Sequence, residues 1–296
     1  MMSKTSASQR TSPSNDPSRV LLLTCVLSLT ACGGSPAKMM TVSKVTVGAT
    51  KYGQTLQFTV EGSLLDATLV AATTACSSPQ RSASSTSTQA TYTCTAALTG
   101  DSSFSVTDPK QSGVLGSTAF NVPLPQVTMT VSNGAGVAGN LVFTLEPNKV
   151  KATVDNFLQY VNDGFYAGTV FHRVVPGFVV QGGGYLPGSG IPNLKTPRAN
   201  IALEVGRGLS NVVYSVAMAR GASANSANSQ FFVNLADNSA NLDPSAANAG
   251  YAVFGVLSTG QDVLSAMTTA PCAPVAGFSE CAPNPNVVIT AASQSR

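Results

Sequence analysis

One cation and one amide are spaced along a segment that is otherwise apolar and rich in glycine. The segment covers residues 171–184, with the letters FHRVVPGFVVQGGG, and the two side chains are Arg173 and Gln181. A guanidinium keeps its charge and donates from a rigid fork, whereas an amide both donates and accepts hydrogen bonds. The pattern predicts a binding groove with two polar handles.

Two neighbouring strands are predicted to hold these handles. Alternation over residues 170–174 indicates one strand, residues 176–177 indicate a turn, and residues 178–181 indicate a second strand. The two handles then point the same way. The glycines at 182–184 let a ligand backbone come close. A phosphate-binding loop is the other interpretation of these glycines, but neither a lysine nor a helix start follows them.

Two further strings follow the first segment. Residues 215–220 read SVAMAR, a polar loop spans 221–229, and residues 230–235 read QFFVNL. Residues 251–256 read YAVFGV, and a helix-like stretch follows at 262–267. Together the three strings resemble the signature of the cyclophilins, the peptidyl-prolyl cis-trans isomerases (rotamases) whose motif runs Phe-His-Arg-Val-Ile-Pro-Gly-Phe-Met-Ile-Gln-Gly-Gly.

The resemblance implies a fold and an activity. It covers residues 126–292 and implies a mainly β protein, with a closed eight-stranded β-barrel capped by two helices. The ending at 182–185 is most similar to periplasmic bacterial members. The implied enzyme is a peptidyl-prolyl cis-trans isomerase that uses no cofactor and no metal and acts on proline-containing polypeptides.

The resemblance also implies roles for individual residues. Arg173 would be the catalytic cation, and Gln181 would orient both Arg173 and the substrate carbonyl. His172 is interpreted as a hydrogen-bonded structural residue, and each apolar site residue has ordinary core packing as its alternative. The substrate site would comprise a proline pocket of Phe178, Val179, Phe232 and Leu242, a neighbouring subsite of Ala219, Arg220 and Gln230, and a wall at Tyr251.

Isomerisation of an X-Pro bond requires no nucleophile, metal or proton relay from the protein. The barrier of roughly 18 to 20 kcal/mol reflects amide resonance that is lost as the bond twists. A dry pocket that fixes the proline ring, and a donor to the emerging nitrogen lone pair, both favour the twisted amide. Removing about 5 to 7 kcal/mol gives an acceleration of roughly 10⁴ to 10⁵. Arg173 is suited to be this donor.

The chain departs from the cyclophilin pattern at the edge of the groove. Asn241 stands where cyclophilins place an aromatic residue, and the chain has no tryptophan. One wall of the groove therefore loses its large apolar surface, so we expect weakened binding of cyclosporin-type ligands. Val179 in place of a methionine also trims the pocket. An insertion at 244–250 could bring another side chain to the groove. These departures keep an alternative function open, a proline-segment-binding chaperone with little catalysis.

The N-terminus resembles a bacterial lipoprotein signal. Arg10 and Arg19 precede an apolar run at 20–31, which is too short to span a membrane but suits a signal peptide. Residues 1–31 are therefore predicted to be removed, with Cys32 lipidated as the membrane anchor. Gly33 is not acidic, which favours the outer membrane, facing the periplasm. An exported protein without a lipid is the alternative.

The remaining cysteines fit an exported protein of the cell envelope. Besides Cys25 and Cys32 the chain has four, namely Cys76, Cys94, Cys272 and Cys281. Two local disulfides, joining the first two and the last two, are the simplest of three connectivities. A zinc site is the weaker alternative, because no Cys-x-x-Cys spacing occurs.

An additional β unit is predicted before the barrel. Residues 32–41 form a tether, and residues 42–122 show short alternating runs separated by small polar turns. This pattern favours a small sandwich that resembles immunoglobulin-like surface domains, with residues 123–125 as a stiff boundary. An adhesion module is therefore a further alternative function. The net charge of +3 with 10% charged residues disfavours nucleic acid as a partner, and we expect a monomer.

A hairpin and a helix are predicted at the start of the second domain. Alternation over 127–131 and 141–145 indicates the hairpin. We expect Thr153 to cap the following helix, Asp155 to lie in its first turn, and Gly164 to end it.

Overall fold

The computed structural model describes residues 38–188, 193–274 and 280–296. The predicted signal peptide at 1–31, with Cys25, and the predicted lipid site Cys32 lie outside the described residues. Within the described part of the chain, no helix is both long enough and apolar enough to cross a membrane.

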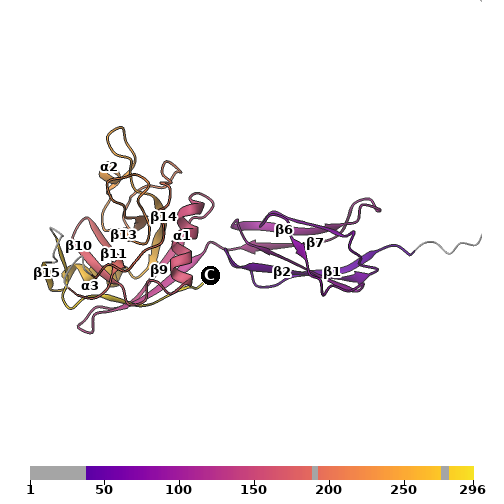
Figure 1. Ribbon diagram of the computed structural model, residues 1–296, viewed down its shortest axis with the longest axis horizontal. Coiled ribbons are helices and arrows are strands. Elements are labelled where there is room, and N and C mark those ends of the chain that lie inside the picture. The colour runs from indigo at the N-terminus through magenta and orange to yellow at the C-terminus, as the bar shows by residue number, and fades with distance from the viewer. Residues whose placement is uncertain (1–37, 189–192, 275–279) are drawn as a thin grey trace, which may run out of the picture. The chain divides into compact units, whose positions relative to one another are not determined.

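The strands before residue 123 form two antiparallel sheets that pack face to face (Figure 1). Phe58 of one sheet stacks on Phe104 of the other, with ring centroids 4.1 Å apart. The predicted disulfide between Cys76 and Cys94 is confirmed. The immunoglobulin-like assignment and the domain boundaries stay predictions. One sheet has the order β1 (Thr41–Val47), β2 (Thr55–Ser63), β5 (Gln89–Thr95) and β4 (Gln80–Arg81), and the other has β3 (Val70–Thr73), β6 (Gly100–Thr107) and β7 (Val114–Val122).

The remaining long strands close into the predicted eight-stranded barrel, in which all neighbours are antiparallel. The predicted hairpin is confirmed as β8 and β9, and the predicted pair around the groove is confirmed as β10 and β11. Strand β17 closes the barrel because it pairs with both β8 and β10. In barrel order the strands are β10 (Val170–Val175), β11 (Val179–Tyr185), β13 (Phe231–Asn234), β12 (Ser215–Met218), β14 (Val253–Thr259), β9 (Ala138–Leu145), β8 (Gln126–Ser132) and β17 (Val288–Gln294).

Helix α1 (Lys151–Asn162) supplies aromatic packing to the barrel core. The ring of Phe157 lies 5.5 Å from that of Phe231 in β13 and 4.8 Å from that of Phe254 in β14. These three rings are fully buried. The core therefore joins this helix to two strands that lie far from it in the sequence.

The expected N-terminal cap of α1 is wrong. The helix begins three residues earlier than expected. Val150 occupies the cap position, so Thr153 lies inside the helix and Asp155 lies beyond its first turn. The carboxylate of Glu204, in a distant loop, accepts hydrogen bonds from the first turn of the helix instead. Both the backbone nitrogen and Oγ1 of Thr153 donate to Glu204 at 2.7 Å. The predicted end is confirmed, because Gly164 has a φ of +68° directly after the helix.

The last part of the chain adds two helices and a small hairpin. Helix α2 (Ser239–Leu242) is one turn long, and α3 (Gln261–Thr269) confirms the predicted late helix. Strands β15 (Cys272–Pro274) and β16 (Cys281–Pro283) pair with each other. The second predicted disulfide, between Cys272 and Cys281, is confirmed in this hairpin. Strand β16 lies beside β10, the strand that carries Arg173.

Candidate active site

A pocket of about 180 Å³ opens on the outer surface of the barrel. It contains both polar handles, Arg173 and Gln181, and every apolar residue predicted for the substrate site. Of the ten predicted catalytic and substrate-binding residues, all of which lie in the described part of the chain, only Gln230 is not part of its lining. The pocket is lined by Arg173, Phe178, Val179, Gln181, Ala219, Arg220, Phe232, Leu242 and Tyr251.

The alternation of the strands explains why these residues meet outside the barrel. In β13, Phe231 belongs to the main core and Phe232 to a second, smaller cluster. In β11, Val180 and Val179 are divided in the same way. Because successive side chains of a strand point to opposite faces, one residue in each pair builds the barrel core and the other builds the pocket floor. Phe232 is only 4% exposed, so the floor is apolar and largely dry.

The polar handles stand next to each other on one edge of this floor. Arg173 in β10 is the register partner of Gln181 in β11. The side-chain nitrogen of Gln181 donates to the side-chain oxygen of Gln230 at 3.1 Å. The carbonyl of Gln230 accepts a hydrogen bond from the nitrogen of Ala219 at 2.9 Å. Gln230 therefore supports the pocket wall from behind the residues that line it.

Arg173 is paired with a carboxylate that sequence analysis missed. Its Nη2 donates to Oε1 of Glu280 at 2.6 Å, and the guanidinium also lies 5.7 Å from the ring centroid of Phe178. Glu280 is 107 positions away along the chain, directly before Cys281. The confirmed disulfide was the one signal in the sequence that pointed to this segment.

The expectation that the glycines admit a ligand backbone is corrected by their contacts. A Cβ on Gly182 would lie 2.8 Å from the ring of Phe171, and one on Gly183 would lie 2.9 Å from the ring of Phe231. A Cβ on Gly184 would lie 2.5 Å from the side chain of Gln230. The glycines therefore make room for the protein's own side chains, which pack directly against the backbone of β11.

Comparisons with known proteins agree with this geometry. The family model for cyclophilin type peptidyl-prolyl cis-trans isomerases matches residues 126–294. The chain belongs to this family. Peptidyl-prolyl cis-trans isomerase A of Dickeya dadantii (strain 3937) is 43% identical over 150 residues, which is 51% of this chain and 77% of that protein. Peptidyl-prolyl cis-trans isomerase B of Escherichia coli (strain K12) is 41% identical over 128 residues, which is 43% of this chain and 76% of that protein.

A solved structure of a cyclophilin type peptidyl-prolyl cis-trans isomerase from Cryptosporidium parvum covers 58% of this chain and 98% of its own, with 23% sequence identity and a TM-score of 0.46.

Two of the departures from the cyclophilin pattern, Asn241 and the insertion at 244–250, contact each other. Asn241 is exposed and is not part of the lining, so no side chain there replaces the family's aromatic residue. The insertion at 244–250 contributes Asn248, whose side chain binds the carbonyl of Asn241 at 2.7 Å. The same side chain accepts from Arg220 at 3.3 Å. The insertion therefore reinforces the subsite around Arg220 and does not refill the pocket.

Arg220 is held against the wall of the cyclophilin pocket by several contacts. Its guanidinium lies 4.6 Å from the ring centroid of Tyr251, and its Nε donates to the carbonyl of Gly250 at 2.9 Å. The ring of Tyr251 also meets that of Phe232 edge to face, with centroids 5.6 Å apart. In this subsite the guanidinium of Arg220 therefore packs on the ring of Tyr251, which in turn packs on the ring of Phe232.

A chain of buried amides, also missed by sequence analysis, fixes the loop behind the pocket. Asn211 donates from its backbone and its side chain to Asp243, in both cases at 2.8 Å. Asn234 donates to Asn211 at 3.2 Å, and Asn238 donates to Asn234 at 2.8 Å. Asn238 also donates to the carbonyl of Phe178 at 2.9 Å. Satisfied buried networks of this kind hold a single geometry, because any broken link leaves an unpaired polar group.

His172 has the environment of a structural residue. It is 3% exposed and meets the ring of Tyr185 edge to face, with ring centroids 4.5 Å apart. Burial lowers the pKa of His172 to about 4, and a backbone hydrogen bond at Val170 opposes this shift. The imidazole is therefore neutral near pH 7, and His172 is not part of the pocket lining.

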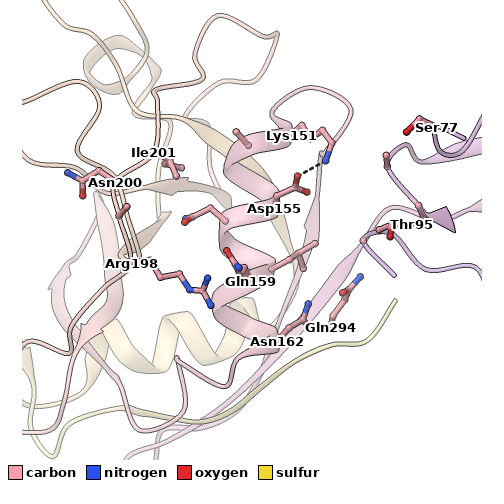
Figure 2. A pocket seen from close by; sticks show the side chains of 17 residues that line it. Ser77, Thr95, Lys151, Asp155, Gln159, Asn162, Arg198, Asn200, Ile201 and Gln294 are labelled. Atoms are coloured by element: carbon pink, nitrogen blue, oxygen red, sulfur yellow. Dashed lines mark hydrogen bonds and ion pairs between the residues drawn. The ribbon is translucent and has the colours of Figure 1, made fainter. Parts of the chain in front are cut away.

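A larger hollow lies elsewhere, along α1, and contains none of the predicted site residues. Figure 2 shows its lining, in which Lys151 and Asp155 of the helix pair at 2.5 Å, with Gln159 and Arg198 close by. Its lining includes the charged side chains of Lys151, Asp155 and Arg198, whereas the smaller pocket predicted from the sequence combines an apolar floor with Arg173, Gln181 and Arg220. Size alone would therefore have pointed to the wrong place.

Proposed function

We propose that this peptidyl-prolyl cis-trans isomerase assists the folding of exported or envelope proteins, by binding their X-Pro segments in the groove and donating a hydrogen bond from Arg173 to the twisting amide. The observation that carries the proposal is the position of the guanidinium at the edge of a buried apolar floor. The cation and the proline pocket therefore belong to one cavity.

The proposed catalysis is a difference in binding between the planar and the twisted amide. The floor formed by Val179, Phe232 and Leu242 would hold the proline ring, so that the bond on its N-terminal side rotates at the rim. As the nitrogen becomes pyramidal it gains a lone pair that can accept a hydrogen bond, which the planar amide cannot do. A donor that meets this lone pair stabilises the transition state more than the bound substrate, which raises the rate.

The neighbouring subsite would bind the substrate as an extended strand. Ala219 and Arg220 follow β12 directly, and the backbone there would pair with the extended substrate. The ring of Tyr251 and the guanidinium of Arg220 would then cover the residue that precedes the X-Pro pair. Extended peptides generally bind in this way, with backbone hydrogen bonds for affinity and side-chain pockets for specificity.

The proposed site of action is the cell envelope. The signal-like segment at 1–31 and Cys32 support it, as do two disulfides, which persist in oxidising compartments. The mature chain would be held on the outer membrane by acyl groups on Cys32, with residues 42–122 as a β unit near the membrane. Mass spectrometry of the N-terminal peptide tests this, with Cys32→Ser as the control. A mature peptide that starts elsewhere and carries no lipid would refute the anchor.

The activity is tested by the rate of cis-to-trans relaxation of an Ala-Pro peptide. We expect the full chain, purified in detergent, to accelerate relaxation strongly, and Arg173→Ala to remove most of the acceleration. The variant's circular dichroism should match that of the wild type, because Arg173 lies outside the barrel core. Equal rates for the folded variant and the wild type would show that Arg173 is not the catalytic cation.

A second candidate function, proline-segment binding with little catalysis, is favoured by the exposed Asn241. Without an aromatic residue at position 241 the pocket would hold a proline ring on fewer sides, which would weaken the fixation that rotation needs. Titration of the full chain with a proline-containing peptide separates the two functions. Saturable binding without acceleration would support the binding module, whereas acceleration supports the isomerase.

A further inference from the structure

The guanidinium of Arg173 is held on two sides by groups of this chain. Glu280 accepts a hydrogen bond from Nη2 at 2.6 Å, and Phe178 lies against the guanidinium at 5.7 Å. The side chains of Arg173 and Glu280 are 20% and 29% exposed. Partial burial strengthens a charge-assisted hydrogen bond, because less water competes for either partner.

Glu280 lies directly before β16 and is supported by the disulfide hairpin of β15 and β16. Cys281 is the next residue, and its disulfide to Cys272 ties β16 to β15. The backbone nitrogen of Asn284 donates to the carbonyl of Pro271 at 2.8 Å, which joins the two strands at the open end of the hairpin. Since β16 lies beside β10, the carboxylate and the guanidinium start from adjacent backbones. The pair is therefore built from supported elements and not from two free side chains.

One carboxylate cannot occupy the whole guanidinium. Arginine carries five N–H donors in a rigid plane, and the hydrogen bond to Glu280 uses one of them. The plane is fixed once one edge is bonded and one face is covered by a ring. The remaining donors then keep a constant direction, and Arg173 is among the residues that line the pocket.

We propose that Glu280 is a positioning residue, which holds the guanidinium of Arg173 in the orientation that donates to the substrate amide. This inference rests on the proposed role of Arg173 and adds the group that orients it. Gln181, which the cyclophilin resemblance made the orienting residue, donates from its side-chain nitrogen to Gln230, and within the described part of the chain the side-chain acceptor bonded to Arg173 is Glu280. In this chain, the orienting role therefore passes to a residue from the disulfide hairpin.

The first measurement separates orientation from binding. In the full chain, Glu280→Ala should lower kcat for the Ala-Pro peptide by about tenfold and change KM by less than about twofold, because the pocket floor is untouched and only the donor's direction is lost. Glu280→Gln keeps an oxygen that can accept from Nη2, so it should recover part of the lost kcat. An unchanged or increased kcat in Glu280→Ala would overturn the proposal.

The second measurement does not depend on turnover. Side-chain ¹⁵N NMR relaxation of Arg173, assigned by the signal that Arg173→Lys removes, reports how freely the guanidinium moves. We expect a restricted guanidinium in the wild type, a mobile one in Glu280→Ala and an intermediate one in Glu280→Gln. If the wild type shows no turnover but Arg173 loosens as expected, the catalytic proposal fails and the positioning stands. Equal mobility in all three proteins would overturn the positioning, whatever the rates.

A matched control is available at another ion pair of the barrel. Arg198 pairs with Asp163, and neither residue lines the candidate active site. Asp163→Ala should free the guanidinium of Arg198 and leave both kcat and the mobility of Arg173 at their wild-type values. A loss of kcat in this control equal to that of Glu280→Ala would show that removing any such carboxylate is enough, and would overturn a specific role for Glu280.

Discussion

The side-chain nitrogen of Gln181 donates to the side-chain oxygen of Gln230 at 3.1 Å. The two glutamines therefore act as one unit, in which Gln181 lines the pocket and Gln230 holds it from behind. The position of Gln230 depends in turn on Gly184, because a side chain there would collide with it. The side chain of Gln181 is thus held by a residue that is not part of the pocket lining.

Replacement of either glutamine should lower activity by different amounts. Gln181→Ala removes a group at the pocket, and a neutral hydrogen bond is worth about 0.5 to 1.5 kcal/mol, so kcat/KM should fall by roughly 2- to 10-fold. Gln230→Ala should have a smaller effect, since it acts only through Gln181. Gln159→Ala, on the exposed face of α1, is the amide control and should have no effect. A larger loss in Gln230→Ala than in Gln181→Ala would contradict this order.

Gly183→Ala should destabilise the barrel strongly. The residue has a φ of +84°, and an added Cβ would lie 2.9 Å from the rings of Phe231 and Tyr166. Backbone strain and overpacking each cost about 1 to 3 kcal/mol, so urea unfolding should show a loss of roughly 2 to 6 kcal/mol. Gly134→Ala is the matched control, since its φ is +66° and nothing lies within 4 Å. Equal losses in the two variants would show that packing against the rings contributes nothing.

The local part of the fold could be predicted because its causes lie close together in the sequence. Alternation along β10 and β11, with a Pro-Gly turn between them, predicts the two strands and a common direction for Arg173 and Gln181, which are register partners in the structure. The same alternation separates Phe231 from Phe232, so one motif specifies both core and pocket. The two short disulfides were predictable for the same reason.

The features that escaped prediction depend on contacts between distant segments. Glu204 caps α1 from a loop 51 positions away, which made the expected role of Thr153 wrong. Glu280 binds Arg173 from 107 positions away along the chain, and no periodic pattern in the sequence predicts this contact. The role of the glycines after Gln181 was also misjudged, because the rings that need the space belong to other strands. The sequence around a glycine does not show which distant side chain will pack against that glycine in the folded protein.

Removal of the second disulfide should affect activity more specifically than removal of the first. Cys272→Ser with Cys281→Ser should lower kcat toward the value of Glu280→Ala, because the hairpin no longer fixes the carboxylate. The control, Cys76→Ser with Cys94→Ser, should leave kcat unchanged. In the chain-entropy model, loss of a disulfide that closes such a short loop lowers the free energy of unfolding by about 2 to 3 kcal/mol. Both double variants should therefore be destabilised by similar amounts. Equal kcat values in the two double variants would contradict the proposed support of Glu280.

His172 should make the stability of the protein sensitive to mild acid. Its pKa is about 4 in the folded protein, because burial disfavours the imidazolium, and about 6.5 in an unfolded chain. The unfolded state therefore binds more protons between these values, so the stability from neutral His172 is complete above about pH 6.5 and is lost as the pH falls toward 4. The full difference corresponds to roughly 3 kcal/mol.

Since the chain has one histidine, His172→Gln should reduce the change with pH of the free energy of unfolding in urea between pH 6.5 and 5, where few other side chains titrate. An equally steep fall in the variant would place the titrating group elsewhere.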